Sequence, residues 1–422
     1  MISAIGALIG LGIAILLISK RVPAAYSLIA GAIAGGLAGG MDLTACIAAM
    51  TDGVKDITPA ILRILSAGVL SGVLIQTGAA ESISTAIIRK SGRDNIYTAL
   101  ALAAMLLCAV GVFIDVAVIT VAPIALSVHR RYGLSPLKLL MMMIGGGKCG
   151  NIISPNPNTI IAAENFGAPL SATMAANLIP AVIGLMFTII AINRIFPDSK
   201  RENLTAGLAE SRNTADETLP SFASAIAGPA VTIILLALRP VAGIAIDPLI
   251  ALPAGGLIGI IAMRRIRTTL SCIDYGLSKM IPVAILLVGT GTIAGIIKAS
   301  SMKDILIDTL SGSAMGETLI APLSGILMSA ATASTTAGAT LASSSFAPTV
   351  LASGIAGLWG AAMTNAGATV LDHLPHGSFF HATGGAMNAT FKERMKLIPY
   401  ETAIGFILTV MSVIAYELFK SI

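Results

Sequence analysis

The sequence predicts an all-α polytopic membrane protein with about 12–13 membrane segments in two inverted-topology halves that contain broken or re-entrant helices. Three observations lead to this prediction. Only 11% of the 422 residues are charged, whereas soluble proteins carry roughly 25%. Apolar runs of about 17–20 residues recur from one end of the chain to the other. Prolines, glycines and polar residues interrupt several runs, and backbone freed in this way must be buried in protein or line a wet cavity.

The first part of the chain has about seven apolar runs long enough to cross a membrane, at residues 2–18, 24–40, 58–76, 96–112, 113–128, 137–153 and 174–195. A second group follows at residues 221–238, 247–263, 279–297, 319–332, 346–363 and 400–418. An odd number of crossings in the first group reverses the direction in which the second group enters the membrane.

The segment between these groups, residues 196–220, is charged and has almost no large apolar side chains. We interpret it as a cytoplasmic linker. The predicted organisation is an N-terminal transmembrane half at residues 1–195, the linker at residues 196–220, and a C-terminal transmembrane half at residues 221–422. The hexapeptide VAPIAL at residues 121–126 is echoed by FAPTVL at residues 346–351, and each precedes a broken polar segment.

Charge and cysteine usage exclude some classes of function. The net charge of +5 comes largely from short basic loops, which indicates membrane topology and not nucleic-acid binding. The four cysteines are scattered without paired spacing, so neither a disulfide framework nor a metal site follows. The N-terminus is apolar without a basic region or cleavage site, and is expected to be a retained first span. Arg63, near the start of a span, is expected to reach the membrane interface.

The most informative polar segment is residues 145–170, GGGKCGNIISPNPNTIIAAENFGAPL. We expect no regular helix through it, because proline removes backbone donors and displaces the preceding residue from helical geometry. Lys148 is a candidate positive charge for a substrate, and Asn151, Asn156 and Asn158 are candidate donors. A purely structural, proline-kinked loop is the alternative.

Two other segments combine polar residues with membrane depth. Asp115 stands amid apolar residues, where a carboxylate is costly unless paired or solvated. Asp115 is therefore either a functional residue or a structural one. A structural Asp115 would form an ion pair or lie at the membrane interface. Residues 328–345, MSAATASTTAGATLASSS, are nearly all small or hydroxylated. They predict either a helix-packing seam or a hairpin whose hydroxyls and helix N-termini meet an anion.

The fourth segment, residues 365–385, gathers Asp372, His373, His376 and His381. Histidines beside a carboxylate suit proton relay or substrate binding. A metal site and a structural role are the alternatives, although Pro375 breaks the helix that would align metal ligands.

Together with a glycine-rich segment at residues 289–302, these segments follow the order of motifs in the gluconate permease (GntP) family of the ion-transporter superfamily, which the chain resembles over nearly its full length. GVFIDVAVITVAPI resembles the family's Gly-x-Phe-x-Asp…Pro-Ile segment. SPNPNTIIAAENFGAPL lies where the family has Pro-Pro-His-Pro-Gly-Pro, and ASTTAGATLASSS where it has Gly-Ser-Ala-Thr-Val-Ala. GATVLDHLPHGSFF is similar to Gly-Ser-x-x-x-Ser-His-x-Asn-Asp-Ser-Gly-Phe-Trp.

The chain departs from the family at these same motifs. The family's motif histidine is replaced by Asn156, and a second family histidine falls on Gly150. In the C-terminal motif His373 is kept, Asp372 stands in place of a serine, and the Asn-Asp pair is replaced by Pro375 and His376. We therefore expect a divergent member with altered chemistry at the site.

The resemblance implies a transporter and not an enzyme. It implies import of a small organic acid, a gluconate-like sugar acid or related hydroxy acid, with protons across the bacterial inner membrane. It also implies an elevator-like motion in a homodimer. We expect the lipid bilayer as surroundings, and no nucleic acid, no cofactor and no metal. The expected proton-coupling residues are Asp115, Asp372 and His373. The expected substrate-binding residues are Lys148, Asn151, Asn156, Asn158, Thr159, Ser334, Thr335 and Thr336.

Two rival functions stay open at this point. A sodium-coupled dicarboxylate or tricarboxylate carrier is compatible with the sequence, because the carbonyl groups of broken helices bind sodium well. A membrane-embedded, metal-dependent enzyme would use the cluster of His373, His376 and His381.

Overall fold

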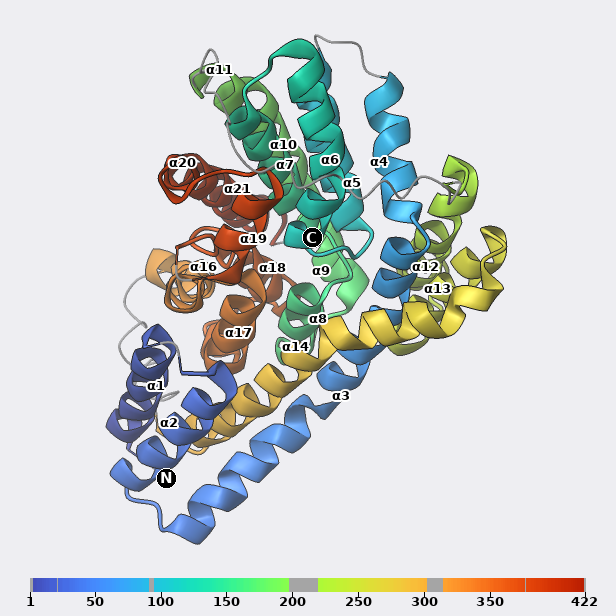
Figure 1. The fold of residues 1–422 in the computed structure, drawn as a ribbon. Coiled ribbons are helices and arrows are strands. Elements are labelled where there is room, and N and C mark those ends of the chain that lie inside the picture. The colour runs from blue at the N-terminus through green and yellow to red at the C-terminus, as the bar shows by residue number, and fades with distance from the viewer. Residues whose placement is uncertain are drawn as a thin grey trace.

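The computed structural model describes residues 3–20, 22–90, 95–196, 219–301, 314–375 and 377–420. Within these ranges every regular element is a helix (Figure 1), so the prediction of an all-α chain is confirmed. The predicted linker lies almost entirely outside the described residues, which resume at residue 219.

Helices of very different length follow one another in both parts of the chain. The first part contains α1 (Ala4–Ser19), α2 (Ala24–Ala38), α3 (Leu43–Gln76), α4 (Ala79–Lys90), α5 (Ile96–Ala109), α6 (Ile114–Tyr132), α7 (Pro136–Asn151), α8 (Pro157–Asn165), α9 (Leu170–Ala176), α10 (Leu178–Phe187), the π-helical turn η2 (Thr188–Ile192) and α11 (Asn193–Ile195). The second part contains α12 (Phe222–Ala242), α13 (Pro248–Ala262), the 3-10 turn η3 (Ile266–Thr268), α14 (Thr269–Lys298), α16 (Ala314–Thr332), α17 (Thr335–Ala352), α18 (Gly357–Gly367), α19 (Ser378–Ala386), α20 (Phe391–Met395) and α21 (Ile398–Phe419).

The two longest described helices, α3 and α14, lie side by side across the molecule (Figure 1). A carbon atom added at Gly53 of α3 would lie 2.1 Å from the Gly291 carbonyl oxygen of α14. One added at Gly72 would lie 2.0 Å from the Cys272 carbonyl oxygen, so the two helices are antiparallel. Backbones approach this closely only where small residues face each other.

Two helix pairs flank these long helices. Helices α1 and α2 pack against each other, and α2 contacts α14. Helices α12 and α13 also pack against each other, and α13 contacts α3. Each pair therefore lies against the long helix from the other part of the chain. We call α1–α3 and α12–α14 the scaffold.

The remaining main helices, α5–α10 and α16–α21, form what we call the core unit. Helices α5 and α6 pair as a hairpin, as do α16 and α17. A helix broken at residues 152–156 follows the first hairpin, and one broken at residues 368–377 follows the second. Each hairpin contacts the short helix of the other part, α6 against α19 and α17 against α8. The similar hexapeptides at residues 121–126 and 346–351 lie in α6 and α17.

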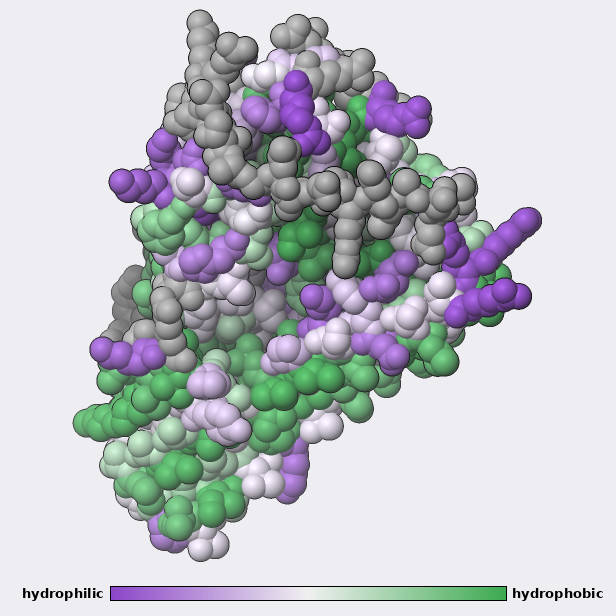
Figure 2. All heavy atoms as spheres, viewed as in Figure 1, coloured by the Kyte–Doolittle hydropathy of each residue, from purple (hydrophilic) through white to green (hydrophobic). Residues whose placement is uncertain are grey.

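The outer surface suits a lipid environment. Large apolar side chains such as Leu62, Ile234 and Ile285 are exposed. Figure 2 shows hydrophobic residues covering the lower part of the visible face, over α1, α2, α3 and α14. Within the described ranges, four helical segments are long and apolar enough to cross a membrane, at residues 43–76, 170–195, 266–298 and 391–419. The chain is a multi-pass membrane protein.

One predicted boundary is wrong at the start of α3, which begins at Leu43 and not near residue 58. Asp42 caps the helix by accepting a hydrogen bond from the Ala45 amide at 2.8 Å. Asp52 and Lys55 form an exposed ion pair at 2.8 Å within this first stretch of the helix, and a pair three residues apart supports a helix.

The predicted span at residues 346–363 is also wrong, because it crosses a break between two helices. Helix α17 ends at Ala352 and α18 begins at Gly357. Gly354 between them has φ +81°, a left-handed conformation that ends a helix.

Candidate functional site

The glycine triplet of residues 145–147 is helical, which corrects the expectation that no regular helix runs through this stretch. Helix α7 continues to Asn151. A carbon atom added at Gly146 would lie 1.9 Å from the Ala101 carbonyl oxygen of α5, and one at Gly150 would lie 2.1 Å from that of Met105. The glycines therefore serve close packing of α7 on α5, and they do not break the helix.

The actual break is confined to residues 152–156 and is closed by Asn156. Its side chain accepts a hydrogen bond from the Thr159 amide at 3.1 Å, which caps α8. The same side chain donates to the Asn151 carbonyl oxygen at 2.9 Å and to Asn151 Oδ1 at 2.6 Å. Asn156 thus holds the two ends of the broken helix together.

Asn158 and Thr159 link this break to the second part of the chain. Asn158 Nδ2 donates to Asn365 Oδ1 of α18 at 2.8 Å. Asn365 Nδ2 donates in turn to Thr159 Oγ1 at 3.0 Å. All three side chains are buried. Asn158 and Thr159 therefore fix α8 against α18.

The two hairpin tips bring further polar groups to the same region. Gly111 at the first tip has φ +106°, and α6 starts three residues later with Asp115 in its first turn. At the second tip Ser334 caps α17 by accepting from the Ala337 amide at 3.3 Å. Thr335 Oγ1 donates to Asp372 Oδ2 at 2.5 Å. The second tip is thus tied to the break between α18 and α19.

Both tips and both breaks meet at one small polar cavity of about 120 Å³. The lining residues come from all four polar segments: Phe113, Ile114, Asp115, Asn151, Ala333, Ser334, Thr335, Thr336, Asp372, Ser378 and Phe379. Helices α6, α17 and α19 all begin here, so three positive helix ends point to one place. Asn151 Nδ2 is buried and has no hydrogen-bond partner among the described residues. The cavity therefore offers donors to an anionic or hydroxylated solute.

A buried ion pair forms the wall behind Asp372. Lys148 Nζ contacts Asp372 Oδ1 and the Thr369 carbonyl oxygen, and it lies 3.1 Å from His373 Nδ1. His373 Nδ1 lies 3.1 Å from Asp372 Oδ1. The exposed fraction of the Lys148 and His373 side chains is 0%. Lys148 is therefore neutralised by Asp372 and does not itself line the cavity.

The structure thus sorts the predicted residues into two groups. Asp115, Asn151, Ser334, Thr335, Thr336 and Asp372 line the cavity. Lys148 and His373 stand behind Asp372, whereas Asn156, Asn158 and Thr159 bond to protein groups around the break.

Sequence reasoning missed a second buried ion pair, between Arg394 of α20 and Glu401 of α21. Glu401 Oε2 lies 3.9 Å from His373 Nδ1, so this pair continues the network of Lys148 and Asp372. The available signal is the carboxylate of Glu401, which stands at the start of the last apolar run, residues 400–418.

The histidines do not gather into a metal site in the part of the chain that the structure describes. His373 bonds inward, whereas His381 Nε2 contacts the Pro375 carbonyl oxygen at 2.9 Å near the surface. His376 lies outside the described residues.

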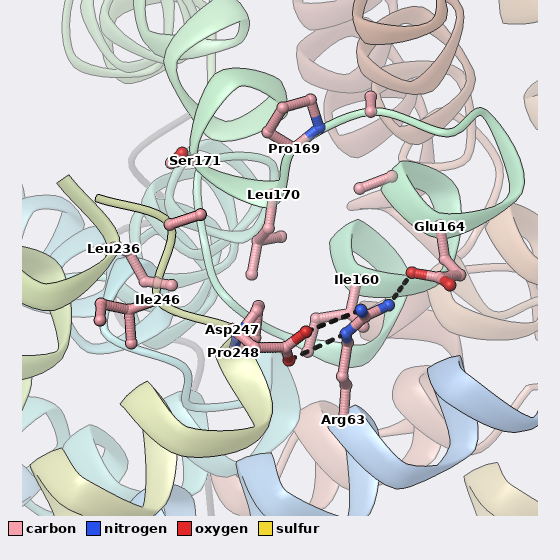
Figure 3. Close-up of a pocket in the computed structure, with 13 residues that line it drawn as sticks. Arg63, Ile160, Glu164, Pro169, Leu170, Ser171, Leu236, Ile246, Asp247 and Pro248 are labelled. Atoms are coloured by element: carbon pink, nitrogen blue, oxygen red, sulfur yellow. Dashed lines mark hydrogen bonds and ion pairs between the residues drawn. The ribbon is translucent and has the colours of Figure 1, made fainter. Parts of the chain in front are cut away.

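A larger cavity of about 200 Å³ lies between α8 and the scaffold (Figure 3). Arg63 of α3 points into it, pairing with Glu164 of α8 and with Asp247 Oδ2 at 2.8 Å. Arg63 therefore joins the core unit to the scaffold, and the expectation that it reaches the interface is wrong. Glu164 and Asp247 both pair with the Arg63 guanidinium, so this side chain is already engaged by protein carboxylates.

Comparisons with known proteins agree with this architecture. A family model described as GntP family permease matches residues 2–253, more than half of the chain. A second model, described as Na+-H+ antiporter family, matches residues 223–313.

Individual relatives give the same picture. The chain is 53% identical over 420 residues to an uncharacterized transporter of Haemophilus influenzae, and the match covers 99% of both chains. It is 26% identical over 242 residues to a gluconate permease of Pseudomonas aeruginosa, across 56% of this chain and 53% of the relative. The match thus spans about half the length of that permease.

A solved structure supports the fold. The crystal structure of the Alcanivorax borkumensis YdaH transporter matches with a TM-score of 0.63 over 90% of both chains, at 14% identity. That identity is too low to carry more than the fold. With the family match, the full-length transporter relative and the fold in agreement, the chain belongs to the GntP permease family and is a transporter and not an enzyme.

Proposed function

We propose that this protein is a secondary active transporter that imports a small organic acid, a gluconate-like sugar acid or related hydroxy acid, together with protons across a bacterial inner membrane. The observation that carries this proposal is Asn151, which lines a cavity where three helix N-termini meet and whose Nδ2 has no hydrogen-bond partner within the described ranges. The similarity to a gluconate permease of Pseudomonas aeruginosa supports the choice of substrate class.

Binding of the substrate carboxylate would rest on the helix ends. The N-terminus of a helix carries roughly half a positive charge and has free amide donors. The first residues of α17, Thr335 and Thr336, line the cavity, as does Ser378 of α19. Asn151 and the hydroxyl groups would read the hydroxyls of the substrate.

Proton coupling would rest on Asp372 and His373, with Asp115 as a second cavity carboxylate. Asp372 meets the cavity on one side and His373 on the other, with 3.1 Å between Oδ1 and Nδ1. A proton taken up by either group offsets the negative charge of an incoming carboxylate. The binding of substrate and proton would then favour each other.

Alternating access would use the two-part construction. We propose that residues 1–195 and 221–422 are inverted-topology halves joined by a cytoplasmic linker at residues 196–220. The order of two helices, a long helix, a hairpin and a broken helix occurs in both parts, which supports this organisation. The core unit would move against the scaffold and carry the cavity with it. Family resemblance supports a homodimer, which native mass spectrometry of purified protein would test.

A thermal-shift screen of purified protein against gluconate, other sugar acids, hydroxy acids and dicarboxylates tests the substrate class. We expect a sugar or hydroxy acid to raise the unfolding temperature, and stabilisation by dicarboxylates alone would contradict the proposal. The strongest ligand is then tested for uptake into proteoliposomes under a pH gradient. We expect uptake to stop with a protonophore.

Sodium is the alternative coupling ion, because the second family match is to a sodium–proton antiporter family. Uptake that follows an imposed sodium gradient and ignores the pH gradient would replace the proton in this proposal. Cell fractionation tests the location in the inner membrane.

A further inference from the structure

Arg394 and Glu401 form an ion pair in the interior, beside the proton-coupling residues proposed above. The exposed fraction of the Arg394 side chain is 1% and that of Glu401 is 0%. The guanidinium contacts both carboxylate oxygens, with 3.1 Å between Nη2 and Oε2. Arg394 Nε also donates to Thr383 Oγ1 of α19 at 3.2 Å. These contacts together hold the Arg394–Glu401 pair in one geometry.

The tautomer of His373 follows from its partners. Nε2 lies 3.2 Å from the Ile398 carbonyl oxygen and 3.0 Å from Thr402 Oγ1. The Ile398 carbonyl oxygen can only accept a hydrogen bond and Lys148 Nζ can only donate one, so we place the hydrogen of the neutral ring on Nε2. The nitrogen that gains or loses a proton is therefore Nδ1.

Nδ1 faces three charged groups from three directions. Lys148 Nζ of α7 lies at 3.1 Å, Asp372 Oδ1 at 3.1 Å, and Glu401 Oε2 of α21 at 3.9 Å. Arg394 of α20 stands behind Glu401. With neutral His373 the two cations and two carboxylates balance. A proton on Nδ1 adds one uncompensated positive charge to a buried site, where charge is costly.

We infer that Glu401 is a positioning residue for proton coupling: Arg394 holds it where its carboxylate stabilises the protonated form of His373. Glu401 acts through His373 and does not line the cavity. Asp372 takes a proton from the cavity and passes it to Nδ1, which leaves Asp372 ionised, and Lys148 keeps its contacts with Asp372 and the Thr369 carbonyl oxygen. The transport part of this inference rests on the proposed function. The titration of His373 does not.

The direct test is nitrogen-15 NMR of histidine-labelled, full-length protein across pH, with His373→Gln to assign the signal. We compare wild type, Glu401→Gln, Glu401→Asp and Glu417→Gln. Glu417 is the matched control, because it lies in the same helix in an exposed ion pair with Lys420. A charge within about 4–6 Å shifts a titration by roughly 1–3 pH units. We expect the His373 midpoint to fall by about one unit or more in Glu401→Gln. We expect it to recover in Glu401→Asp and to stay at the wild-type value in Glu417→Gln.

Loss of Glu401 leaves Arg394 buried and unpaired, so Glu401→Gln protein is at risk of misfolding. The double variant Arg394→Met/Glu401→Gln removes both charges and keeps the fold testable. The titration midpoint of His373 should also fall in the double variant, but by less than in Glu401→Gln. The double variant loses the attractive charge of Glu401 and also the repulsive charge of Arg394, which stands behind Glu401. An unchanged midpoint in either folded variant overturns the inference.

The transport readout separates this inference from the proposed function. If wild-type proteoliposomes take up an organic acid with protons, the pH profile of uptake should shift in the same direction as the His373 midpoint. If no proton-coupled uptake occurs in wild type, the proposed function fails. The NMR titration then still decides whether Glu401 controls the protonation of His373.

Discussion

Lys148 and Asp372 form a fully buried ion pair, although 224 positions separate them in the chain. The pair joins α7 to the break after α18, so it binds the two parts of the core unit to each other. Asp372 also accepts a hydrogen bond from Thr335 at the second hairpin tip. One carboxylate thereby connects three of the four segments that surround the cavity.

Breaking this pair should strongly destabilise the protein. Removal of one partner of a buried ion pair leaves an uncompensated charge and costs roughly 3–5 kcal/mol. We expect Lys148→Ala and Asp372→Ala each to lower the free energy of unfolding by about this amount, and the double variant by less than the sum. Denaturant unfolding in detergent measures all three.

The exposed pair of Glu417 and Lys420 provides the control. Their side chains are 46% and 47% exposed. The same alanine substitutions there should change the free energy of unfolding by less than about 1 kcal/mol. Equal effects at both pairs would contradict the buried arrangement.

Thr336→Val should weaken substrate binding without changing stability. Thr336 lines the cavity, and valine keeps the shape of threonine while removing its hydroxyl. Loss of one neutral hydrogen bond of about 1 kcal/mol corresponds to roughly a fivefold weaker Kd. Titration of purified protein with the ligand from the thermal-shift screen measures this. Thr51→Val on the exposed surface of α3 is the control, and equal affinity in both variants would remove Thr336 from the site.

Asn156→Ala should lower the stability of the protein and should not remove a direct contact with the substrate. Its side chain caps α8 and bridges the break to Asn151, and loss of such a cap costs about 0.5–2 kcal/mol. Asn156→Ser keeps an oxygen that can accept from the Thr159 amide, so it should recover part of the loss. Thermal unfolding compares the three proteins. An Asn156→Ala protein of wild-type stability that binds no ligand would instead assign this side chain to the substrate.

Gly146→Ala should disrupt the packing of α7 on α5. The added methyl group would meet the Ala101 carbonyl oxygen at 1.9 Å, and overpacking of a core costs about 1–3 kcal/mol. Gly12 in α1 is the matched control, because a carbon atom added there meets no atom within 4 Å. Gly12→Ala should be neutral or raise stability by up to about 1 kcal/mol. The unfolding temperature should therefore fall in Gly146→Ala and should stay unchanged or rise in Gly12→Ala.

Sequence pattern was sufficient for the all-α membrane fold, because backbone groups in lipid must be satisfied within helices. It also located the segments that line the cavity, since prolines and polar residues are tolerated at membrane depth only where they face protein or water. Sequence pattern did not predict that the glycines of α7 are helical, because a run of glycines is found both where helices pack closely and where a helix breaks. It failed at Glu401, because a lone carboxylate at the start of an apolar run resembles an interface residue.

The sequence by itself determined that this chain crosses the membrane as helices and that its polar groups concentrate at four places. Only the tertiary structure decided which of those groups meet. Asn151 and Asn156 are five residues apart with the same side chain, yet one lines the cavity and the other closes the helix break. Helix formation depends on neighbours a few residues away, which a sequence displays directly. Pairing of Lys148 with Asp372, and of Glu401 with Arg394 beside His373, depends on how distant helices pack, and that is settled by the sum of many small contacts across the fold.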